Sequence, residues 1–328
     1  MKIAVIENDK IIIKQAEDEK LGDRKGALVK VLGCGLCGSD IVKFVHKIAK
    51  NGTVLGHEIV AKIVDINSDT DFKIGDEIVT SHHIPCGECV YCKHGNVSMC
   101  KHFKSTNIRP GGFSELVYLS EEHLQNVAHL KPENLTDIEA SFYEPLGCIV
   151  RAVKRANLLD GDEVLVVGLG SIGILTAQAL KAYGAKVTGC DLISERIDVL
   201  KSLEINALDV RTLSEENKFD AIYMTSGADK AIDTALKYVR NGGKIVVFSS
   251  TPHDETSYPN NEIYYRELTV MGSYSPAPVD LKDSLELLRT KKVKVKGLST
   301  EYKLDDIAQA FEDTMANRIM KAYIQVAS

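Results

Sequence analysis

The sequence contains no tryptophan, and aromatic residues make up only 6% of its 328 residues. Broad stacking platforms for nucleic-acid bases are therefore not expected. An excess of positive charge is also missing, because 40 Lys and Arg stand against 46 Asp and Glu, which gives a formal net charge of −6. We therefore expect neither a nucleic-acid partner nor an anionic membrane partner.

Long apolar runs are missing as well. The longest stretch without a charged residue, 164–180, is shorter than the ~20 residues of a membrane-spanning helix, and glycines interrupt it. The opening residues Met1–Glu7 hold too short an apolar run for a signal-peptide core, and no cleavage site follows. We therefore expect a cytoplasmic protein, in which disulfide bonds are rare.

The pattern of apolar residues divides the chain into two unlike halves. Residues 1–120 read as short β segments separated by turns, and Asn8 and Asp9 predict a hairpin at the start. After residue 160, strands and helices alternate, which is typical of right-handed βαβ units on a parallel sheet. The sequence therefore predicts an α/β protein of two domains, a number that the length also favours.

The expected strands are Met1–Glu7, Lys10–Gln15, Ala27–Leu32, Glu58–Ile66, Asp76–Thr80, Phe113–Leu119, Glu163–Val167, Lys186–Cys190, Ala221–Thr225, Lys244–Ser249 and Leu268–Gly272. The expected helices are 137–156, Ile172–Tyr183, Ser194–Leu203 and Lys230–Val239.

Eight cysteines are present, and four of them crowd into one short segment. Gaps of two, two and seven residues separate Cys86, Cys89, Cys92 and Cys100. Zinc binds thiolates tetrahedrally, and four sulfurs leave no coordination position open. The spacing therefore predicts a structural rather than a catalytic zinc, with a four-thiolate iron–sulfur cluster as the alternative.

A glycine-rich turn follows the expected strand at 163–167 and opens a helix, which is the setting that a dinucleotide-binding turn requires. The turn consists of Gly168, Leu169, Gly170, Ser171, Ile172 and Gly173. Gly168 allows the tight turn, Gly170 lets the backbone approach the pyrophosphate, and Gly173 lets the helix pack against the strand. The N–H groups at the start of this helix, around Ser171 and Ile172, then face the phosphates.

The next expected strand is followed by Asp191, 18 residues after Gly173. A carboxylate at this place accepts hydrogen bonds from the adenosine ribose hydroxyls and repels a 2′-phosphate, which favours NAD over NADP. Arg196 lies nearby and can weaken this preference, or it is simply a charge on the helix surface.

Further motifs complete a resemblance to a known family. Gly35-Leu36-Cys37-Gly38-Ser39-Asp40 and Leu55-Gly56-His57-Glu58 precede the cysteine segment, and 111–115 and Glu144-Pro145-Leu146 follow it. In this order the motifs resemble the zinc-dependent medium-chain dehydrogenases, which include alcohol, sorbitol and threonine dehydrogenases.

The resemblance implies a β-rich, GroES-like catalytic domain combined with a doubly wound Rossmann domain. It places the catalytic zinc domain at 1–146, the NAD-binding domain at 147–274, and a return to the catalytic domain at 275–328. It also implies two zinc ions per chain, one catalytic and one structural, and a homodimer or homotetramer formed through the edge strand near Leu268–Gly272.

By resemblance, Cys37 and His57 are ligands of the catalytic zinc. A third protein ligand is needed, and Glu58 and Glu144 are both candidates, since the polyol-dehydrogenase branch carries a glutamate at the latter position. A carboxylate ligand makes the metal harder and more tolerant of oxygen-rich substrates. Alternatively, Glu58 is a buried ion-pair partner and Glu144 caps a helix.

The resemblance also assigns the proton path. Ser39 resembles the hydroxyl that passes on the proton of the alcohol, and Asp40 resembles the carboxylate that orients His57. Val42 stands where the alcohol and sorbitol enzymes usually carry a relay histidine, so His46, one helical turn further on, or water takes that role.

We therefore expect an NAD-dependent zinc dehydrogenase that oxidises a secondary alcohol of a polyol, sugar or sugar derivative, or reduces the matching ketone. Threonine, butanediols and simple alcohols are the alternative substrates. A non-catalytic nucleotide-binding relative and a zinc-ribbon adaptor are alternatives of another class. Cys34, Cys148 and Cys190 are expected to be packing residues, and His82 and His83 to be solvated or structural.

Overall fold

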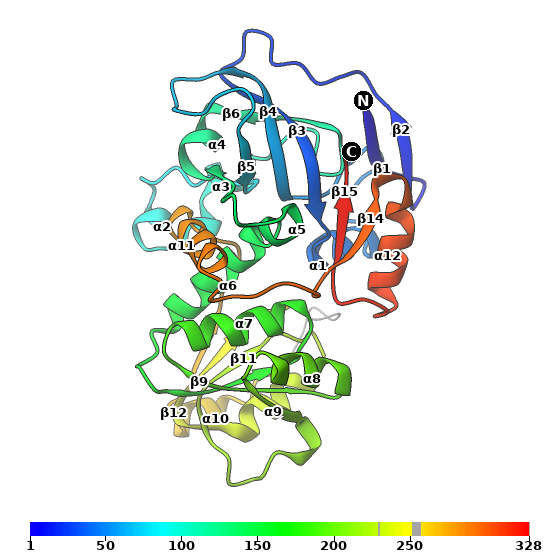
Figure 1. The fold of residues 1–328 in the computed structure, drawn as a ribbon. Coiled ribbons are helices and arrows are strands. Elements are labelled where there is room, and N and C mark those ends of the chain that lie inside the picture. The colour runs from blue at the N-terminus through cyan, green and yellow to red at the C-terminus, as the bar shows by residue number, and fades with distance from the viewer. Residues whose placement is uncertain (229, 251–256, 328) are drawn as a thin grey trace. The chain divides into compact units, whose positions relative to one another are not determined.

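The computed structural model describes residues 1–228, 230–250 and 257–327. Within that part, no helix combines the length and the apolar character needed to cross a lipid bilayer. The chain divides into two compact units (Figure 1). The first unit contains Met1–Gly147, Ala277–Arg289 and Val295–Ser328, and the second contains Cys148–Pro276 and Thr290–Lys294. The domain boundaries expected at 1–146, 147–274 and 275–328 remain a prediction. In the division into two compact units, residues 290–294 belong to the second unit.

A hairpin opens the first unit. It pairs β1 (Lys2–Glu7) with β2 (Lys10–Gln15) in antiparallel register. The turn residues Asn8 and Asp9 have φ angles of 49° and 61°. Two successive left-handed residues are what a two-residue type I′ turn requires, so the predicted hairpin is confirmed.

A seven-stranded sheet forms the rest of the frame of this unit. Its order is β14-β15-β3-β4-β5-β7, with β6 also paired to β3, and all pairs are antiparallel except β14 with β15. The strands are β3 (Gly26–Gly35), β4 (Glu58–Asn67), β5 (Glu77–Thr80), β6 (Leu116–Ser120), β7 (His129–Leu130), β14 (Thr300–Lys303) and β15 (Ala322–Gln325).

The register of the sheet brings several of the predicted site residues to one end of it. Gly35, the last residue of β3, lies opposite Glu58 on β4 and opposite Tyr323 on β15. Cys37 follows β3, Glu58 begins β4, and Lys321 directly precedes β15. Three segments that are distant in sequence therefore meet at the same edge.

Short helices surround this sheet. They are α1 (Gly38–Val45), α2 (Val90–Lys93), α3 (Lys101–Ser105), α4 (Glu121–Asn126), α5 (Asp137–Ala140), α11 (Pro278–Arg289) and α12 (Ile307–Met315), with 3₁₀ turns at Val97–Met99 and Leu304–Asp306. Phe311 of α12 is buried in the core of this unit, with its ring against Phe44 and Phe113.

The second unit is a doubly wound parallel sheet, which confirms the predicted fold class. Its strand order is β10-β9-β8-β11-β12-β13, and every pair is parallel. Figure 1 shows α7 and α8 on one face of this sheet and α9 and α10 on the other. The strands are β8 (Glu163–Val167), β9 (Lys186–Asp191), β10 (Asn206–Asp209), β11 (Phe219–Met224), β12 (Val239–Val247) and β13 (Thr269–Gly272). The helices are α6 (Tyr143–Ala156, from Cys148 on), α7 (Ser171–Ala182), α8 (Ser194–Ser202), α9 (Ala231–Tyr238) and α10 (Asn260–Tyr265), with a 3₁₀ turn at Val210–Thr212.

Some expected elements differ from the observed ones. The single helix expected at 137–156 is interrupted between Ala140 and Tyr143. Pro145 has no N–H to donate, so it is accommodated in the first turn of a new helix rather than inside a continuous one. The strand expected at Phe113–Leu119 begins only at Leu116, because the N–H of Phe113 is already bonded to the Leu55 carbonyl.

Candidate active site

Four cysteine thiols converge in the segment after β5. The sulfurs of Cys86 and Cys100 are 3.5 Å apart, those of Cys89 and Cys92 are 3.6 Å apart, and those of Cys86 and Cys92 are 4.0 Å apart. All four lie within 4.8 Å of one another. Sulfurs that share a tetrahedral zinc at ~2.3 Å stand about 3.8 Å apart. The donor set therefore fits a structural zinc with every position filled by protein.

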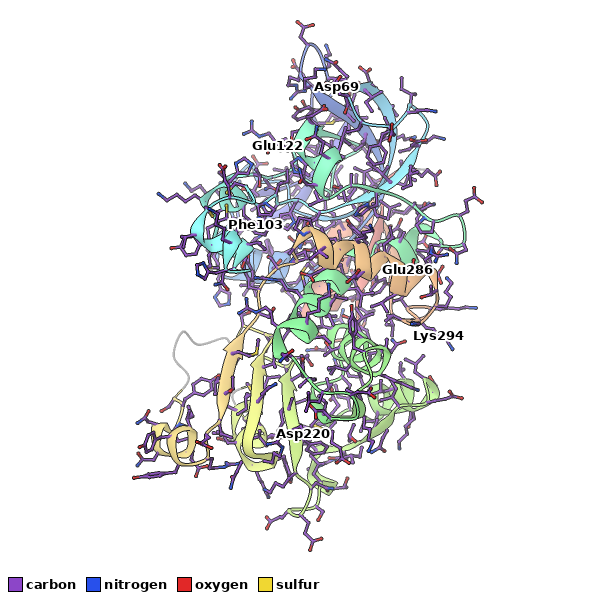
Figure 2. All side chains as sticks on the ribbon, turned by 90° about the vertical axis from the view of Figure 1, so that its left-hand side faces the viewer. Asp69, Phe103, Glu122, Asp220, Glu286 and Lys294 are labelled. Atoms are coloured by element: carbon purple, nitrogen blue, oxygen red, sulfur yellow. The ribbon has the colours of Figure 1, made fainter. Side chains whose placement is uncertain are left out.

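Local structure and one core residue hold this lobe. Cys89 is the N-cap of α2 and Cys100 the N-cap of α3, so each thiol stands at the start of a short helix. Phe103 of α3, labelled in Figure 2, is buried and packs its ring 4.8 Å from that of His83. Phe103 thus helps to anchor the lobe, and a bound metal would cross-link its four thiols.

A second group of metal-binding side chains consists of Cys37, His57 and Glu58, whose ligand atoms lie within 4.8 Å of one another. Cys37 is the N-cap of α1, and its sulfur accepts hydrogen bonds from the N–H and the hydroxyl of Ser39 at 3.5 and 3.3 Å. His57 and Glu58 are buried at the start of β4. A thiolate, an imidazole and a carboxylate in one place are the donors of a catalytic zinc.

Asp40 fixes the orientation of the histidine. Its Oδ1 lies 3.4 Å from His57 Nδ1, which leaves Nε2 for a metal. Burial alone would raise the pKa of Asp40, but the facing His57 keeps this pKa below its ordinary value. Asp40 also accepts a hydrogen bond from the backbone N–H of Cys37 at 3.3 Å, so one carboxylate braces two members of the group.

Glu58 is shared between this group and a buried lysine. Its Oε2 lies 2.5 Å from the Nζ of Lys321, and the two side chains are almost fully buried. Burial lowers the pKa of Lys321, but the Glu58 carboxylate more than offsets this, and the pKa lies above its ordinary value. Oε1 of Glu58 has no hydrogen-bond partner among the described residues. A buried oxygen without a partner is costly, and a bound metal ion would satisfy it.

The glycine turn is shaped to receive a ligand. Gly168 has φ +97°, and a Cβ there would lie 2.7 Å from Ser226. A Cβ at Gly173 would lie 1.8 Å from the Gly168 carbonyl oxygen, so the helix approaches the strand as closely as it does only because a side chain is missing. A Cβ at Gly170 would meet nothing within 4 Å, which leaves space above the N-terminus of α7.

Asp191 stands at the end of β9, beside this turn. Its Oδ2 accepts a hydrogen bond from the N–H of Leu169 at 2.6 Å, and its Oδ1 accepts from Leu192 at 2.7 Å and Ile193 at 3.0 Å. The nearest guanidinium nitrogen of Arg196 lies 3.7 Å from Oδ2. The carboxylate is therefore fixed in place, with one cation at its side.

Comparison with known proteins agrees with this geometry. Residues 23–129 match the model of the alcohol dehydrogenase GroES-like domain, and residues 171–290 match that of the zinc-binding dehydrogenases. A sorbitol dehydrogenase of Halalkalibacterium halodurans is 30% identical over 94% of each chain. The chain belongs to the zinc-dependent medium-chain dehydrogenase family. D-xylulose reductase A of Aspergillus oryzae is also 30% identical, over 93% of this chain and 90% of that protein.

Solved structures share the fold of this dehydrogenase. An alcohol dehydrogenase from Thermus sp. ATN1 superposes with a TM-score of 0.87 at 24% identity, with each chain covered completely. Galactitol-1-phosphate dehydrogenase from Escherichia coli gives the same TM-score and identity over 99% of this chain and 100% of that chain. The predicted combination of a GroES-like domain and a Rossmann domain is confirmed.

Other residues that the sequence singled out lie in different settings in the dehydrogenase. Glu144 is buried in the first turn of α6 and is not part of either group of metal-binding side chains among the described residues. His46 is exposed at the C-cap of α1, and Ser39 is exposed about two turns earlier, in the first turn of the same helix.

Two residues at the site were missed by sequence reasoning. Lys321 carries no motif and reaches Glu58 only through the pairing of β15 with β3. His82 is expected to be solvated or structural, and its place at the site was not predicted: its ring lies 4.5 Å from that of His57, and its Nδ1 is buried without a partner among the described residues. Burial, reinforced by the nearby His57, keeps the pKa of His82 well below its ordinary value, so the ring is neutral.

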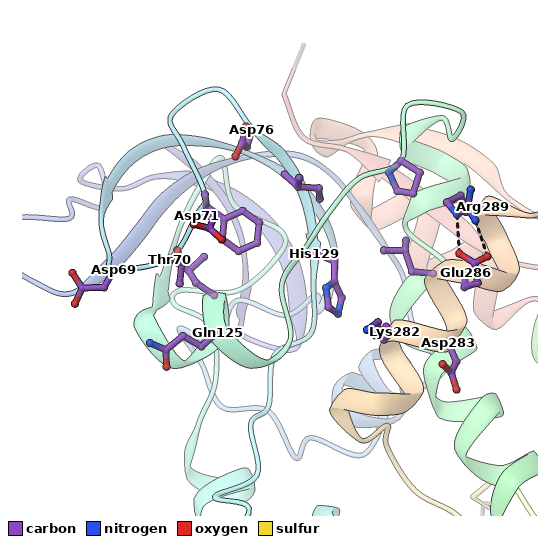
Figure 3. Close-up of a pocket in the computed structure, with 15 residues that line it drawn as sticks. Asp69, Thr70, Asp71, Asp76, Gln125, His129, Lys282, Asp283, Glu286 and Arg289 are labelled. Carbon is purple, nitrogen blue, oxygen red and sulfur yellow. Dashed lines mark hydrogen bonds and ion pairs between the residues drawn. The ribbon is translucent and has the colours of Figure 1, made fainter.

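The first unit contains a small pocket and a larger hollow. A pocket of about 230 Å³ is lined by Asp40, His57 and His82 and therefore adjoins the metal-binding group. A larger hollow of about 960 Å³ lies between the loop that carries Asp71 and helix α11, where Lys282 stands (Figure 3). None of the predicted site residues lines the larger hollow, whereas Asp40 and His57 line the smaller pocket.

We expect Lys321→Met to destabilise the metal-free dehydrogenase by about 3–5 kcal/mol, because Glu58 would keep a buried negative charge without its cation. The loss should be smaller in zinc-loaded protein, where the metal supplies positive charge beside the same carboxylate. Chemical unfolding with and without chelator measures both values. Lys303→Met, at an exposed site on β14, is the control and should stay within ~0.5 kcal/mol of the wild type. If the metal-free Lys321→Met variant were as stable as the metal-free wild type, this would contradict a stabilising ion pair between Lys321 and Glu58.

Proposed function

We propose that Cys37, His57 and Glu58 are the protein ligands of the catalytic zinc and that Cys86, Cys89, Cys92 and Cys100 hold the structural zinc. The observation that carries this proposal is the convergence of the first three side chains at one end of the sheet. Three protein ligands leave a fourth position for substrate or water. Between the two candidates for the third ligand, the geometry supports Glu58, and we propose that Glu144 does not bind zinc directly.

We further propose that the dehydrogenase transfers hydride between NAD(H) and a secondary alcohol or ketone. When bound, zinc supplies a Lewis acid that polarises the substrate oxygen, and NAD supplies the hydride acceptor. We assign the orientation of the metal ligand and the transfer of the proton to residues of the chain. Asp40 holds His57 in the orientation for binding metal, and the exposed Ser39 hydroxyl, next to Cys37, takes the proton of the alcohol and passes it to His46 or to water.

Polyols, sugars or sugar derivatives are the proposed substrate class. The relatives with 30% identity include a sorbitol dehydrogenase and a D-xylulose reductase. A carboxylate in the zinc shell favours oxygen-rich ligands. The polar lining of the small pocket, which includes His82 and Asn107, supplies groups that can bond additional hydroxyls.

A substrate panel tests this proposal. Polyols, sugars, sugar phosphates, amino alcohols and simple alcohols are each offered with NAD and with NADP, and absorbance of the reduced cofactor is followed at several pH values. We expect the highest kcat/KM for a polyol or sugar derivative with NAD. Turnover of simple alcohols or threonine alone would contradict the substrate class, and no NAD-linked turnover of any alcohol would contradict the function.

Asp191→Ala should weaken NAD(H) binding by roughly 10–100-fold, since bonds from ribose hydroxyls to a carboxylate are worth about 1.5–3 kcal/mol. The variant should also gain activity with NADP relative to NAD, because the repelling charge is lost and Arg196 stays nearby to meet a 2′-phosphate. Initial rates with both cofactors give the ratio. Asp191→Asn keeps an acceptor oxygen for the backbone N–H groups and should show the change in preference with less loss of stability. Asp198→Ala, on the exposed face of α8, is the matched control, and an unchanged ratio in both Asp191 variants would exclude the ribose assignment.

We propose a homodimer or homotetramer acting in the cytoplasm. Support for assembly comes from β13, which ends the described sheet with one side unpaired. A row of free backbone groups on an edge strand is a template for pairing with a second copy. Light scattering of the purified protein measures the mass, and a monomer at micromolar concentration would contradict this part of the proposal.

A further inference from the structure

The strand order locates the two halves of the proposed dinucleotide. Chain connections run outward in both directions from β8 and β11, and in such sheets the pyrophosphate lies at this switch point, beyond the carboxyl ends of the strands. Asp191 is the last residue of β9, so the adenosine half belongs to the side of β9 and β10. The nicotinamide half then belongs to β11, β12 and β13. The segment Ser273–Ser275, which directly follows β13, lies at that carboxyl edge.

A buried arginine holds this segment. Arg151 of α6 is only 4% exposed, and its Nη1 donates hydrogen bonds to the carbonyl oxygens of Tyr274 at 2.6 Å and Ser275 at 3.0 Å. Ser275 has φ +60°, a left-handed conformation that is costly for a residue other than glycine and persists only where its surroundings enforce it. The guanidinium therefore fixes the backbone path that the chain takes as it leaves β13.

Ser273 is the first residue of this segment after β13. Its N–H continues the ladder with a bond to the Val247 carbonyl at 3.3 Å, but its hydroxyl is buried and has no hydrogen-bond partner among the described residues. Buried hydroxyls are rarely left without a partner in a native protein. A polar ligand group at the end of β13 would satisfy this one.

We propose that Arg151 is a positioning residue for the nicotinamide half of NAD. Its guanidinium fixes the carbonyls of Tyr274 and Ser275, so that the Ser273 hydroxyl is held ready for a polar group of the nicotinamide end. Arg151 itself bonds to backbone and does not touch the cofactor. This inference rests on the proposed NAD-dependent function, and its test separates the two.

The test compares two ligands that differ by the nicotinamide. Calorimetry measures the Kd of ADP-ribose, which lacks that ring, and of NADH, for wild type and Arg151→Met. We expect NADH to bind at least ~tenfold more weakly to the variant while the Kd of ADP-ribose stays within about twofold. The KM of NAD should rise in step with the Kd of NADH, whereas the KM of the alcohol at saturating NAD should not change. Arg151→Lys keeps a cationic donor and should recover part of the NADH affinity.

Arg266 provides a matched control. Its guanidinium also holds two backbone carbonyls, those of Leu236 and Val239, but at the amino end of β12, away from the carboxyl edge. Arg266→Met should lower Tm and leave both Kd values unchanged. If the role of Arg151 were only structural, Arg151→Met would likewise lower Tm and leave the Kd values of NADH and ADP-ribose unchanged.

Ser273→Ala keeps the inference testable even if Arg151→Met does not fold. The substitution removes a hydroxyl without breaking a bond found among the described residues, so stability should hold while NADH affinity falls and ADP-ribose affinity does not. Equal effects on both ligands in Arg151→Lys and Ser273→Ala, or no effect on either, would overturn the inference. Failure of wild-type protein to bind ADP-ribose would instead overturn the proposed function.

Discussion

Cys37→Ser should reduce kcat/KM of the dehydrogenase by at least ~10³-fold. A metal acting as a Lewis acid contributes several kcal/mol to such a reaction, and each ~1.4 kcal/mol corresponds to a factor of ten in rate. Serine has a far higher pKa than cysteine and is a poor zinc ligand, so one of three protein ligands would be lost. Affinity for NADH should remain close to that of the wild type, since the glycine turn and Asp191 belong to the other compact unit. Steady-state kinetics and fluorescence titration with NADH measure the two quantities.

Cys34→Ala is the matched control for this substitution. Cys34 is a buried thiol of β3 that lies three residues earlier and donates a hydrogen bond to the Gly35 carbonyl at 3.4 Å. Its removal leaves a small cavity that costs about 1 kcal/mol, but it removes no proposed ligand. The Cys34→Ala variant should therefore keep its zinc and most of its activity. Full turnover in Cys37→Ser would show that this thiolate does not hold the catalytic metal.

Cys100→Ser should act on stability before activity. The lobe has Phe103 as its buried anchor, and structural zinc contributes ~10–16 kcal/mol to the folding of small zinc-finger peptides. Even about 3 kcal/mol of this would lower Tm by roughly 6–12 °C if the first unit, which falls in the range of 150–250 residues, unfolds as its own domain. We also expect a new proteolytic site within residues 86–100 and the loss of one zinc per chain. Thermal unfolding, limited proteolysis and metal analysis measure the three effects.

Glu88→Gln is the control that tests whether any substitution in the lobe lowers Tm, creates a proteolytic site and removes a zinc ion. Glu88 is exposed in the turn between Cys86 and Cys89, and no role is assigned to it. This variant should keep both zinc ions, and its Tm should not change. A Cys100→Ser variant as stable and as resistant to protease as Glu88→Gln would contradict a structural metal in the lobe.

Local patterns predicted the parts of the molecule that are built locally. The cysteine spacing brings its thiols together within one segment, and the glycine turn joins one strand to the next helix. The hairpin turn at Asn8 and Asp9 is equally local. By contrast, β10 was not expected, because Asn206–Asp209 is short and half polar and becomes a strand only by pairing with β9. The periodicity of so short a segment does not contain that information.

Sequence patterns alone could not predict the contacts of the site that join residues distant in sequence. The sequence left both Glu58 and Glu144 as candidates for the third ligand. Only the alignment of β3, β4 and β15 brings Glu58 beside Cys37, His57 and the missed Lys321. The contact of His82 with His57 was likewise not predicted, since it depends on how the chain leaves β5. The resemblance to dehydrogenases identified Cys37 and His57, which are separated by the whole of α1 and the following loop.

X-ray diffraction at the zinc absorption edge, from crystals grown without chelator, tests the central claim most directly. We expect two anomalous peaks per chain. One should lie among the four thiols of the lobe, and the other within about 2.0–2.3 Å of Cys37 Sγ, His57 Nε2 and a Glu58 oxygen. A single peak in the lobe, with Cys37 and His57 turned away from each other in otherwise well-ordered density, would contradict a catalytic metal at this site.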